Sequence, residues 1–214
     1  MSEEANYKDN QELREAYEKW AKICECGLES VVSLISNLKT ENEMSDEERN
    51  YYHRIDYRIK TWESVCGKCA KKGIEPTIDN IKAHILDVAG IRIITWYEDD
   101  IYRVYEAISH HPSIFEAREP RDYIANPKEN GYRSFHYNIE YSLYFSRKTV
   151  KVPIEIQIRD IAMDLWGAME HNIKYKNPTP SKDAPEAFKG LAKILTAFDQ
   201  EAMKLRDQGI ENNS

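Results

Sequence analysis

The sequence predicts an α+β fold, in which a mixed β-sheet of about five strands is flanked by helices, with additional helices at both ends of the chain. Three patterns support this prediction. Apolar residues recur every three or four positions near both ends, as in amphipathic helices. Segments between them alternate apolar and polar residues, as half-buried strands do. One β-branched, continuously apolar run is typical of an interior strand.

The first predicted element is a long amphipathic helix over residues 13–38. Residues 40–50 are acidic and show no periodicity, which predicts a linker. The apolar stripe of the helix consists of Tyr17, Trp20, Cys24, Leu28, Val31, Ile35 and Leu38.

Residues 53–60 then alternate, which predicts a strand with one charged face. Thr61 is expected to cap a helix that Gly73 closes, and Thr77 a second short helix that ends near Asp87. The remaining predicted elements are an interior strand (90–97), a helix (101–108), a weak strand (114–118), a hairpin (133–145 and 149–158) and helices over 165–173 and 188–198.

Composition excludes several classes of protein. With 214 residues, 41% of them hydrophobic and 31% charged, the chain is long enough and apolar enough to bury a core without disulfide bonds or structural metal ions. A net charge of -7 argues weakly against a protein that grips long nucleic acids. No apolar leader or stretch of about 20 apolar residues is present, so we expect a cytoplasmic protein without a membrane partner.

The four cysteines form two closely spaced pairs, Cys24 with Cys26 and Cys66 with Cys69. The second pair has the spacing of a zinc knuckle. Both pairs fall inside predicted helices, where no turn can bend the thiolates around an ion. We therefore interpret them as buried or idle thiols rather than as a metal site.

The second hairpin strand carries an entirely polar face, formed by Lys151, Glu155, Gln157 and Arg159. Taken alone, this face is as consistent with a solvated side of the sheet as with a site. Other segments add polar residues at strand faces or strand starts, and these are Arg58, Lys60, Asp87, Arg92, Asn130, Tyr132, Arg133 and His136. If these faces coincide, two carboxylates lie among several cations.

Two carboxylates in a cationic cleft suit metal-assisted phosphoryl transfer. Mg²⁺ takes carboxylate and phosphate oxygens, and Arg and Lys neutralise the remaining phosphate charge. Asp87 and Glu155 are the candidate Mg²⁺ ligands. The sequence has no Walker loop, no dinucleotide fingerprint and no His-Asp metal pair of the phosphohydrolase kind.

Five ordered motifs together resemble the synthetase domain of RelA/SpoT proteins over residues 54–176. Because little else is present, the chain is similar to the small alarmone synthetases. The resemblance divides the chain into an N-terminal helix and linker (1–50), a synthetase domain (51–177) and a C-terminal helix for oligomerisation (178–214). The motifs are Arg58-Ile-Lys60 with Ser64, Asp87-Val-Ala-Gly-Ile-Arg92, residues 128–136, Glu155-Ile-Gln157-Ile-Arg159, and Glu170-His171 with Tyr175-Lys176.

The resemblance implies a nucleotidyltransferase-like fold and transfer of the β,γ-pyrophosphate of ATP to the 3′-hydroxyl of GDP or GTP, giving ppGpp or pppGpp. It implies that Arg58 and Arg92 sandwich the adenine of ATP. Lys60 and Ser64 would hold the phosphates of ATP. Asp87 matches the Mg²⁺ ligand, and Glu155 matches a second carboxylate that binds the metal, activates the hydroxyl, or does both.

On the acceptor side, the resemblance implies that Tyr132 stacks on guanine. Without the family pattern, Tyr132 would more often be a packing residue and His136 a structural histidine. The other residues implied around the acceptor are Lys128, Asn130 and His136, with Gln157 and Arg159 in support and with His171 and Lys176 as candidate phosphate contacts.

The long terminal helices and the resemblance indicate a homotetramer, and single-stranded RNA or (p)ppGpp are candidate regulators. Asp164 stands where product-activated relatives carry Asn, and its carboxylate argues against activation by the product. Two alternatives remain. One is a toxic relative that uses an adenine nucleotide or the tRNA 3′ end as acceptor. The other is a non-catalytic nucleotide- or RNA-binding regulator, which retention of Asp87 and Glu155 disfavours.

Overall fold

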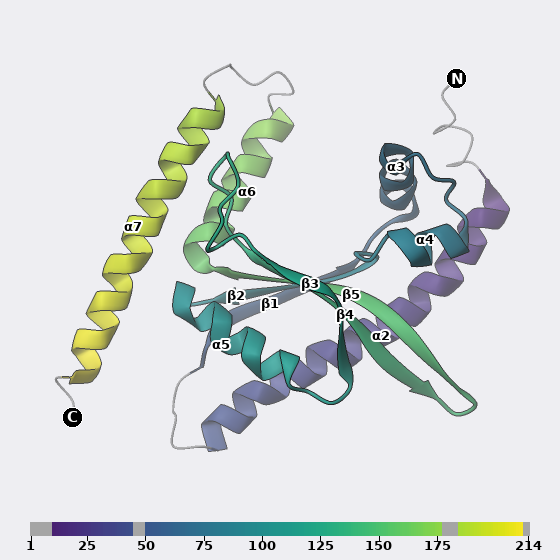
Figure 1. The fold of residues 1–214 in the computed structure, drawn as a ribbon, viewed down its shortest axis with the longest axis horizontal. Helices are drawn as coiled ribbons and strands as arrows, with labels where there is room; N and C mark the ends of the chain where they lie inside the picture. Colours follow the sequence, from purple (N-terminus) through teal and green to yellow (C-terminus); the bar gives the residue numbers. More distant parts are fainter. Residues whose placement is uncertain (1–9, 45–49, 177–183, 212–214) are drawn as a thin grey trace.

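The computed structural model describes residues 10–44, 50–176 and 184–211. Within these ranges a five-stranded mixed sheet is packed between helices (Figure 1). The elements are α2 (Gln11–Met44), β1 (Tyr52–Ile59), α3 (Trp62–Lys72), α4 (Ile78–His84), β2 (Ala89–Thr95), α5 (Glu98–Ser109), β3 (Ile114–Asp122), β4 (Phe135–Phe145), β5 (Lys148–Asp160), α6 (Ile161–Lys176) and α7 (Ala184–Glu211).

The sheet has the strand order β1-β2-β5-β4-β3. Only β2 and β5 run parallel, and the other neighbours are antiparallel. The parallel register places Gly90 beside Glu155 and Arg92 beside Gln157. These polar positions of two distant segments therefore share one face of the sheet.

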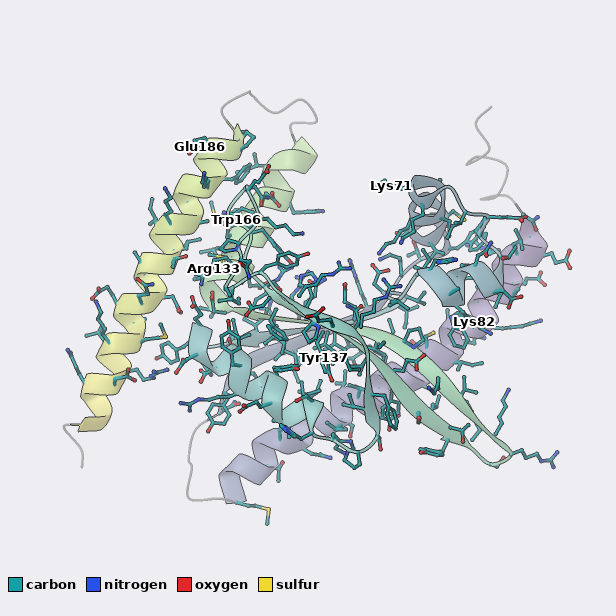
Figure 2. The ribbon with its side chains drawn as sticks, viewed as in Figure 1. Lys71, Lys82, Arg133, Tyr137, Trp166 and Glu186 are labelled. Atoms are coloured by element: carbon teal, nitrogen blue, oxygen red, sulfur yellow. The ribbon has the colours of Figure 1, made fainter. Side chains whose placement is uncertain are left out.

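The opposite face of the sheet is apolar and is covered by α2 and α5 (Figure 1). Leu28, Val31 and Ile35 of α2 are buried there. Tyr137 of β4 points to the same side (Figure 2). Because this face supplies the main core, the polar face of the sheet does not have to be buried and can carry a functional site. The strand residues of the core are Ile91, Ile93, Ile139, Val152, Ile154, Ile156 and Ile158.

The polar face lies between two groups of helices, α3 and α4 at one end and α6 and α7 at the other (Figure 1). A small second core joins α6 to α7, in which Trp166 packs on Phe188 and donates a hydrogen bond from Nε1 to the Phe188 carbonyl at 2.9 Å. Met163 and Ala192 complete this core. The helix pair thus forms one wall beside the polar face.

Local sequence signals act as expected at the caps. The Thr61 and Thr77 hydroxyls accept hydrogen bonds from the amides of Ser64 and Asn80, and Gly73 ends α3 at a φ of 66°. Several element bounds differ from the prediction; α7, for example, spans Ala184–Glu211 rather than 188–198. Three of these differences concern the predicted linker and the surroundings of the site. The linker prediction was wrong for residues 40–44, which extend α2, while 45–49 lie outside the described residues.

The other two differences lie next to the site. The helix after Thr77 ends at His84, short of Asp87, and β3 continues to Asp122. Cys24, Cys66 and Cys69 are buried and Cys26 is exposed, and all four are free thiols within helices. None of the helices in the three described ranges combines the length and apolar character needed to cross a bilayer.

α7 meets the sheet at a cluster of three carboxylates, whose oxygens lie within 4.8 Å of one another. They belong to Glu98, Asp160 and Asp199, and the last two are buried. Burial, and then repulsion from Asp160, raise the pKa of Asp199 to about 7. Arg133 supplies the opposing positive charge, because its Nη2 lies 2.5 Å from Glu98 Oε2.

Gly27 of α2 sits directly on β5, and we expect its replacement to be harmful. A Cβ at this position would lie 3.0 Å from the Val152 side chain. At an exposed helix position without close neighbours, Gly→Ala stabilises the folded state by about 1 kcal/mol. Gly190 of α7 is such a position, because nothing lies within 4 Å of its Cβ position, and it serves as the control. Gly190→Ala should raise the melting temperature by about 2–4 °C, and Gly27→Ala should lower it. An equal rise in both variants, measured by thermal unfolding, would contradict this packing.

The carboxylate cluster predicts a stability that falls as the pH rises. The unfolded chain loses the Asp199 proton near its ordinary pKa of 3.8, whereas the folded chain keeps it to about 7. Between these values unfolding releases a proton, so each rise in pH lowers the free energy of unfolding. Asp199→Asn should therefore raise the melting temperature more at pH 8 than at pH 5, because only part of the loss has accumulated at pH 5. A gain of the same size at both values would show that repulsion at Asp199 is not the cause.

Candidate active site

A hollow of about 150 Å³ opens on the polar face of β1, β2 and β5. Gly90 lies at its centre, between Arg58 and Glu155 in the register of the sheet. A Cβ at Gly90 would meet no atom within 4 Å, so a larger residue would fill the hollow. The lining residues are Asp56, Tyr57, Arg58, Lys60, Asp87, Gly90, Ile91, Arg92, Glu155 and Gln157.

Asp87, in the turn before β2, is the first acidic group of the hollow. Its Oδ2 accepts from Lys60 Nζ at 2.8 Å and Lys68 Nζ at 2.7 Å. Burial alone would raise the pKa of Asp87, but the hydrogen bonds and charges of the two lysines outweigh it and lower the pKa. Its Oδ1 is buried and has no hydrogen-bond partner. Asp87 is therefore an ionised carboxylate with one oxygen left for a cation.

Glu155 of β5 is the second acidic group. Gln157 Nε2 donates to its Oε2 at 2.9 Å, and His136 Nδ1 lies 3.6 Å from its Oε1. Burial and the nearby Asp87 favour a higher pKa, but the contacts with His136 and Gln157 prevail and lower the pKa of Glu155. Both carboxylates are therefore ionised at neutral pH and face the same hollow.

Tyr132 and His136 form a chain of hydrogen bonds that ends at Glu155. Arg159 Nη2 donates to the Tyr132 hydroxyl at 2.8 Å, and that hydroxyl lies 2.9 Å from His136 Nε2. Because Arg159 occupies the oxygen as a donor, the tyrosine proton is free to bond Nε2. The imidazole proton then sits on Nδ1, facing Glu155. In this arrangement the Tyr132 hydroxyl donates its proton to His136, and the His136 imidazole directs its proton toward Glu155.

Two arginines border the other side of the hollow. Arg58 makes no ion pair with any described carboxylate, so its guanidinium is available. Arg92 Nη1 lies 3.6 Å from Asp164 Oδ1, and Arg54 Nη2 lies 3.0 Å from Asp164 Oδ2. Arg159 Nη1 of β5 also lies 3.9 Å from Asp164 Oδ1, so Asp164 balances the charge of arginines from three strands.

The β3–β4 loop (residues 123–134) holds the remaining predicted acceptor residues. Lys128 Nζ lies 4.7 Å from the centre of the Tyr132 ring, and Asn130 Nδ2 donates to Glu170 Oε1 at 2.8 Å. The loop thus brings a cation and an amide next to Tyr132, which is linked to Glu155 through His136. Sequence reasoning placed all three in one motif, and the structure brings them together.

Three predicted residues lie apart from these groups. Ser64 is in the first turn of α3, where its amide is capped by Thr61, and it does not line the hollow. His171 is exposed on α6 and lines none of the described hollows. The Lys176 side chain lies outside the described residues.

The sequence interpretation missed a second hollow behind the carboxylates. Asp87 and Glu155 line it together with several cations. Lys68 is the most important residue that the sequence interpretation omitted, because it contacts Asp87 directly. Its signal was available, because Lys68 follows Ser64 by one helical turn on the same face of α3. The cationic residues of this second hollow are Lys68, Lys72, Arg118 and Arg121, and His84 also lines it.

The carboxylates of Glu98, Asp160 and Asp199 are close enough to hold a metal ion, but they form a less suitable donor set. Arg133 already contacts Glu98 at 2.5 Å, and burial raises the pKa of Asp160, so a proton and a guanidinium balance this cluster. Asp87 instead offers a free, ionised oxygen beside Glu155. Oxygen donors of that kind fit Mg²⁺.

Comparisons with known proteins agree with this geometry. The model of the region found in RelA / SpoT proteins matches residues 57–180. The GTP pyrophosphokinases YwaC and YjbM of Bacillus subtilis are 38% and 34% identical over 71% of this chain, covering 72% and 70% of their own lengths.

Solved structures give the same result. Small alarmone synthetase 1 from Bacillus subtilis, bound to its product pppGpp, superposes with a TM-score of 0.81 at 27% identity, over 90% of this chain and 97% of that one. Small alarmone synthetase 2 from the same organism gives 0.80 at 30% identity, over 90% and 98%. The sheet, the flanking helices and the motif residues of this chain therefore have a common origin with those proteins, and the chain belongs to the RelA/SpoT family.

Proposed function

We propose that this protein is a GTP pyrophosphokinase, which transfers the β,γ-pyrophosphate of ATP to the 3′-hydroxyl of GDP or GTP. The observation that carries the proposal is the pair of ionised carboxylates, Asp87 and Glu155, between two cation-lined hollows. Two polyphosphate nucleotides need two such hollows, and the reacting groups must meet at their shared wall. The named activities of the related proteins support the same assignment.

Asp87 Oδ1 and a Glu155 oxygen would hold Mg²⁺. The unpartnered Asp87 oxygen and the low pKa of both carboxyls fit a dication. When bound, the ion would neutralise phosphate charge that develops during transfer. Lys60 and Lys68 stand beside it and can move from Asp87 to phosphate oxygens, which keeps the local charge balanced.

ATP would occupy the first hollow. Arg58 and Arg92 project from adjacent strands over the space above Gly90, where planar guanidinium groups can stack on adenine. Lys60 at the far end of the hollow, with Ser64 and Lys68 on α3, would receive the phosphates. The base and phosphates are thereby held at opposite ends of one groove.

The acceptor nucleotide would bind between the β3–β4 loop and the second hollow. Tyr132 stacks on guanine once the flexible Lys128 swings off its ring, and Asn130 and His136 contact the nucleotide. Arg118 and Arg121, which pair with no described carboxylate, would receive its 5′-phosphates. Gln157 and Arg159 hold Glu155 and Tyr132 in place.

In the transfer step, the acceptor 3′-oxygen attacks the β-phosphorus of ATP. The new O–P bond forms as the bond between the β-phosphorus and the α-bridging oxygen breaks, and AMP leaves with that electron pair. The 3′-hydroxyl proton passes to Glu155 and then to solvent. A low pKa makes Glu155 a weak base, which suffices because little charge develops on the attacking oxygen in a loose transition state.

The acceptor is tested by incubating purified protein with labelled ATP, Mg²⁺ and GDP, GTP, AMP or tRNA in turn. We expect transfer to guanine nucleotides, and Glu155→Gln should slow it by about 10²–10⁴-fold. Glu140→Gln is a matched control, because Glu140 pairs only with Lys151 on the exposed hairpin. Labelled pyrophosphate found on the AMP acceptor or on tRNA, in place of guanine products, would instead identify the corresponding toxic relative. No product with any acceptor would favour a non-catalytic regulator.

We also propose that α6 and α7 bind a second copy of this chain on the way to a homotetramer. Eight large apolar side chains are exposed on the described parts of these helices, including Ile194 at 66% and Phe198 at 64%, with Ile161, Ile173, Leu191 and Leu205 among them. Patches of this kind mark interaction surfaces. The other two residues are Leu165 and Met169.

Light scattering after size exclusion tests the oligomer. Wild-type protein should run as a multiple of 25.1 kDa, and Ile194→Lys with Phe198→Glu should run as a smaller species. Tyr144→Glu, on the hairpin tip and 72% exposed, is the control that should leave the mass unchanged. A monomeric wild type would contradict the proposal.

A further inference from the structure

The β3–β4 loop faces two parts of the protein through two neighbouring side chains. Tyr132 faces the active site, where its hydroxyl contacts Arg159 and His136. The next residue, Arg133, contacts α5 and α7 instead (Figure 2). One peptide unit therefore connects the predicted guanine-stacking residue to the C-terminal helix.

Arg133 is held from two sides. Its Nη2 donates to Glu98 Oε2 at 2.5 Å, and its Nη1 donates to Thr196 Oγ1 at 2.9 Å. Only 11% of the Arg133 side chain is exposed, and the charges of Asp160 and Asp199 also act on it. A guanidinium with such partners has little freedom to move.

The backbone of the loop also lies against α7. Gly131 has a φ of 85°, and a Cβ there would lie 2.6 Å from the Cβ of Ala192 and 3.3 Å from the Cα of Lys189. This approach requires glycine for both its conformation and its lack of a side chain. The loop is therefore seated on α7 at Gly131 and anchored to it at Arg133.

The other contacts of the loop are made largely within it and with the sheet, as between the Tyr132 hydroxyl and Arg159. Its turn is closed by the Gly131 amide, which donates to the Lys128 carbonyl at 2.8 Å, and residues 125–129 are exposed. Asn130 Nδ2 also donates to Glu170 Oε1 of α6 at 2.8 Å. α7 is thus a principal support for the side chains that would meet the acceptor.

We infer that Arg133 and Thr196 are positioning residues, through which α7 holds the β3–β4 loop in the shape that binds the acceptor guanine nucleotide. This inference rests on the proposed function, because it assigns a role in acceptor binding. Through these two residues, α7 would contribute to the specificity of the site for its acceptor nucleotide. The ATP hollow is built from β1, β2 and β5 and has no α7 residue in its lining, so ATP binding should not depend on this contact.

Thr196→Val tests the inference, because it removes the hydroxyl with little change in shape. We expect the KM for GDP to rise about 3–10-fold, as for one lost hydrogen bond, with the KM for ATP changed less than about twofold. Arg133→Met should raise the KM for GDP further, and Arg133→Lys should recover part of the loss through Glu98. Thr149→Val, an exposed threonine on β5, is the matched control.

A second measurement does not need activity. Hydrogen–deuterium exchange at residues 123–134 should be faster in Thr196→Val than in wild type or Thr149→Val. Equal rises in both KM values, or unchanged exchange in the loop, would overturn the inference and leave Arg133 as a purely structural residue. If wild-type protein transfers nothing to guanine nucleotides, the proposed function fails, whereas the exchange result still decides whether α7 holds the loop.

Discussion

The parallel pairing of β2 with β5 is the constraint on which the rest of the structure depends. It places Gly90 beside Glu155 and Arg92 beside Gln157, although the residues of each pair are 65 positions apart in the sequence. The same pairing directs most isoleucines of both strands to the opposite face, where α2 and α5 cover them; these are Ile91, Ile93, Ile154, Ile156 and Ile158. A shift of one residue would bury the carboxylate and expose the core, so packing and chemistry fix the same register.

Much of the fold was predictable because local chemistry determines it. The alternation of β5, the apolar stripe of α2 and the capping threonines each identify an element without tertiary information. The strand order was not predictable, because side-chain periodicity says which face a residue takes and not which strand lies beside it. The extension of α2 through residues 40–44 was also missed, since an exposed polar segment shows no periodicity whether or not it is helical.

The candidate site divides in the same way. Glu155, Gln157 and Arg159 lie on one strand face, so the sequence could place them together. It could join Asp87 and Tyr132 to them only on the condition that the polar faces of different strands coincide. Lys68 was missed because it reaches Asp87 only through the way α3 packs beside β2. The ties of Asp164 to Arg54 and Arg92 depend likewise on the position of α6. Local patterns find the side chains of a strand, but contacts between elements require the structure.

The contact between Gly131 and Ala192 limits how sequences of this kind can vary. The space that a side chain at position 131 would need is already filled by the Ala192 methyl group. A larger residue at either position must push the loop and the helix apart, so substitutions at the two sites are not independent. A loop grafted from another protein would need the helix surface against which it packs in that protein. The loop and α7 are therefore best exchanged as one unit.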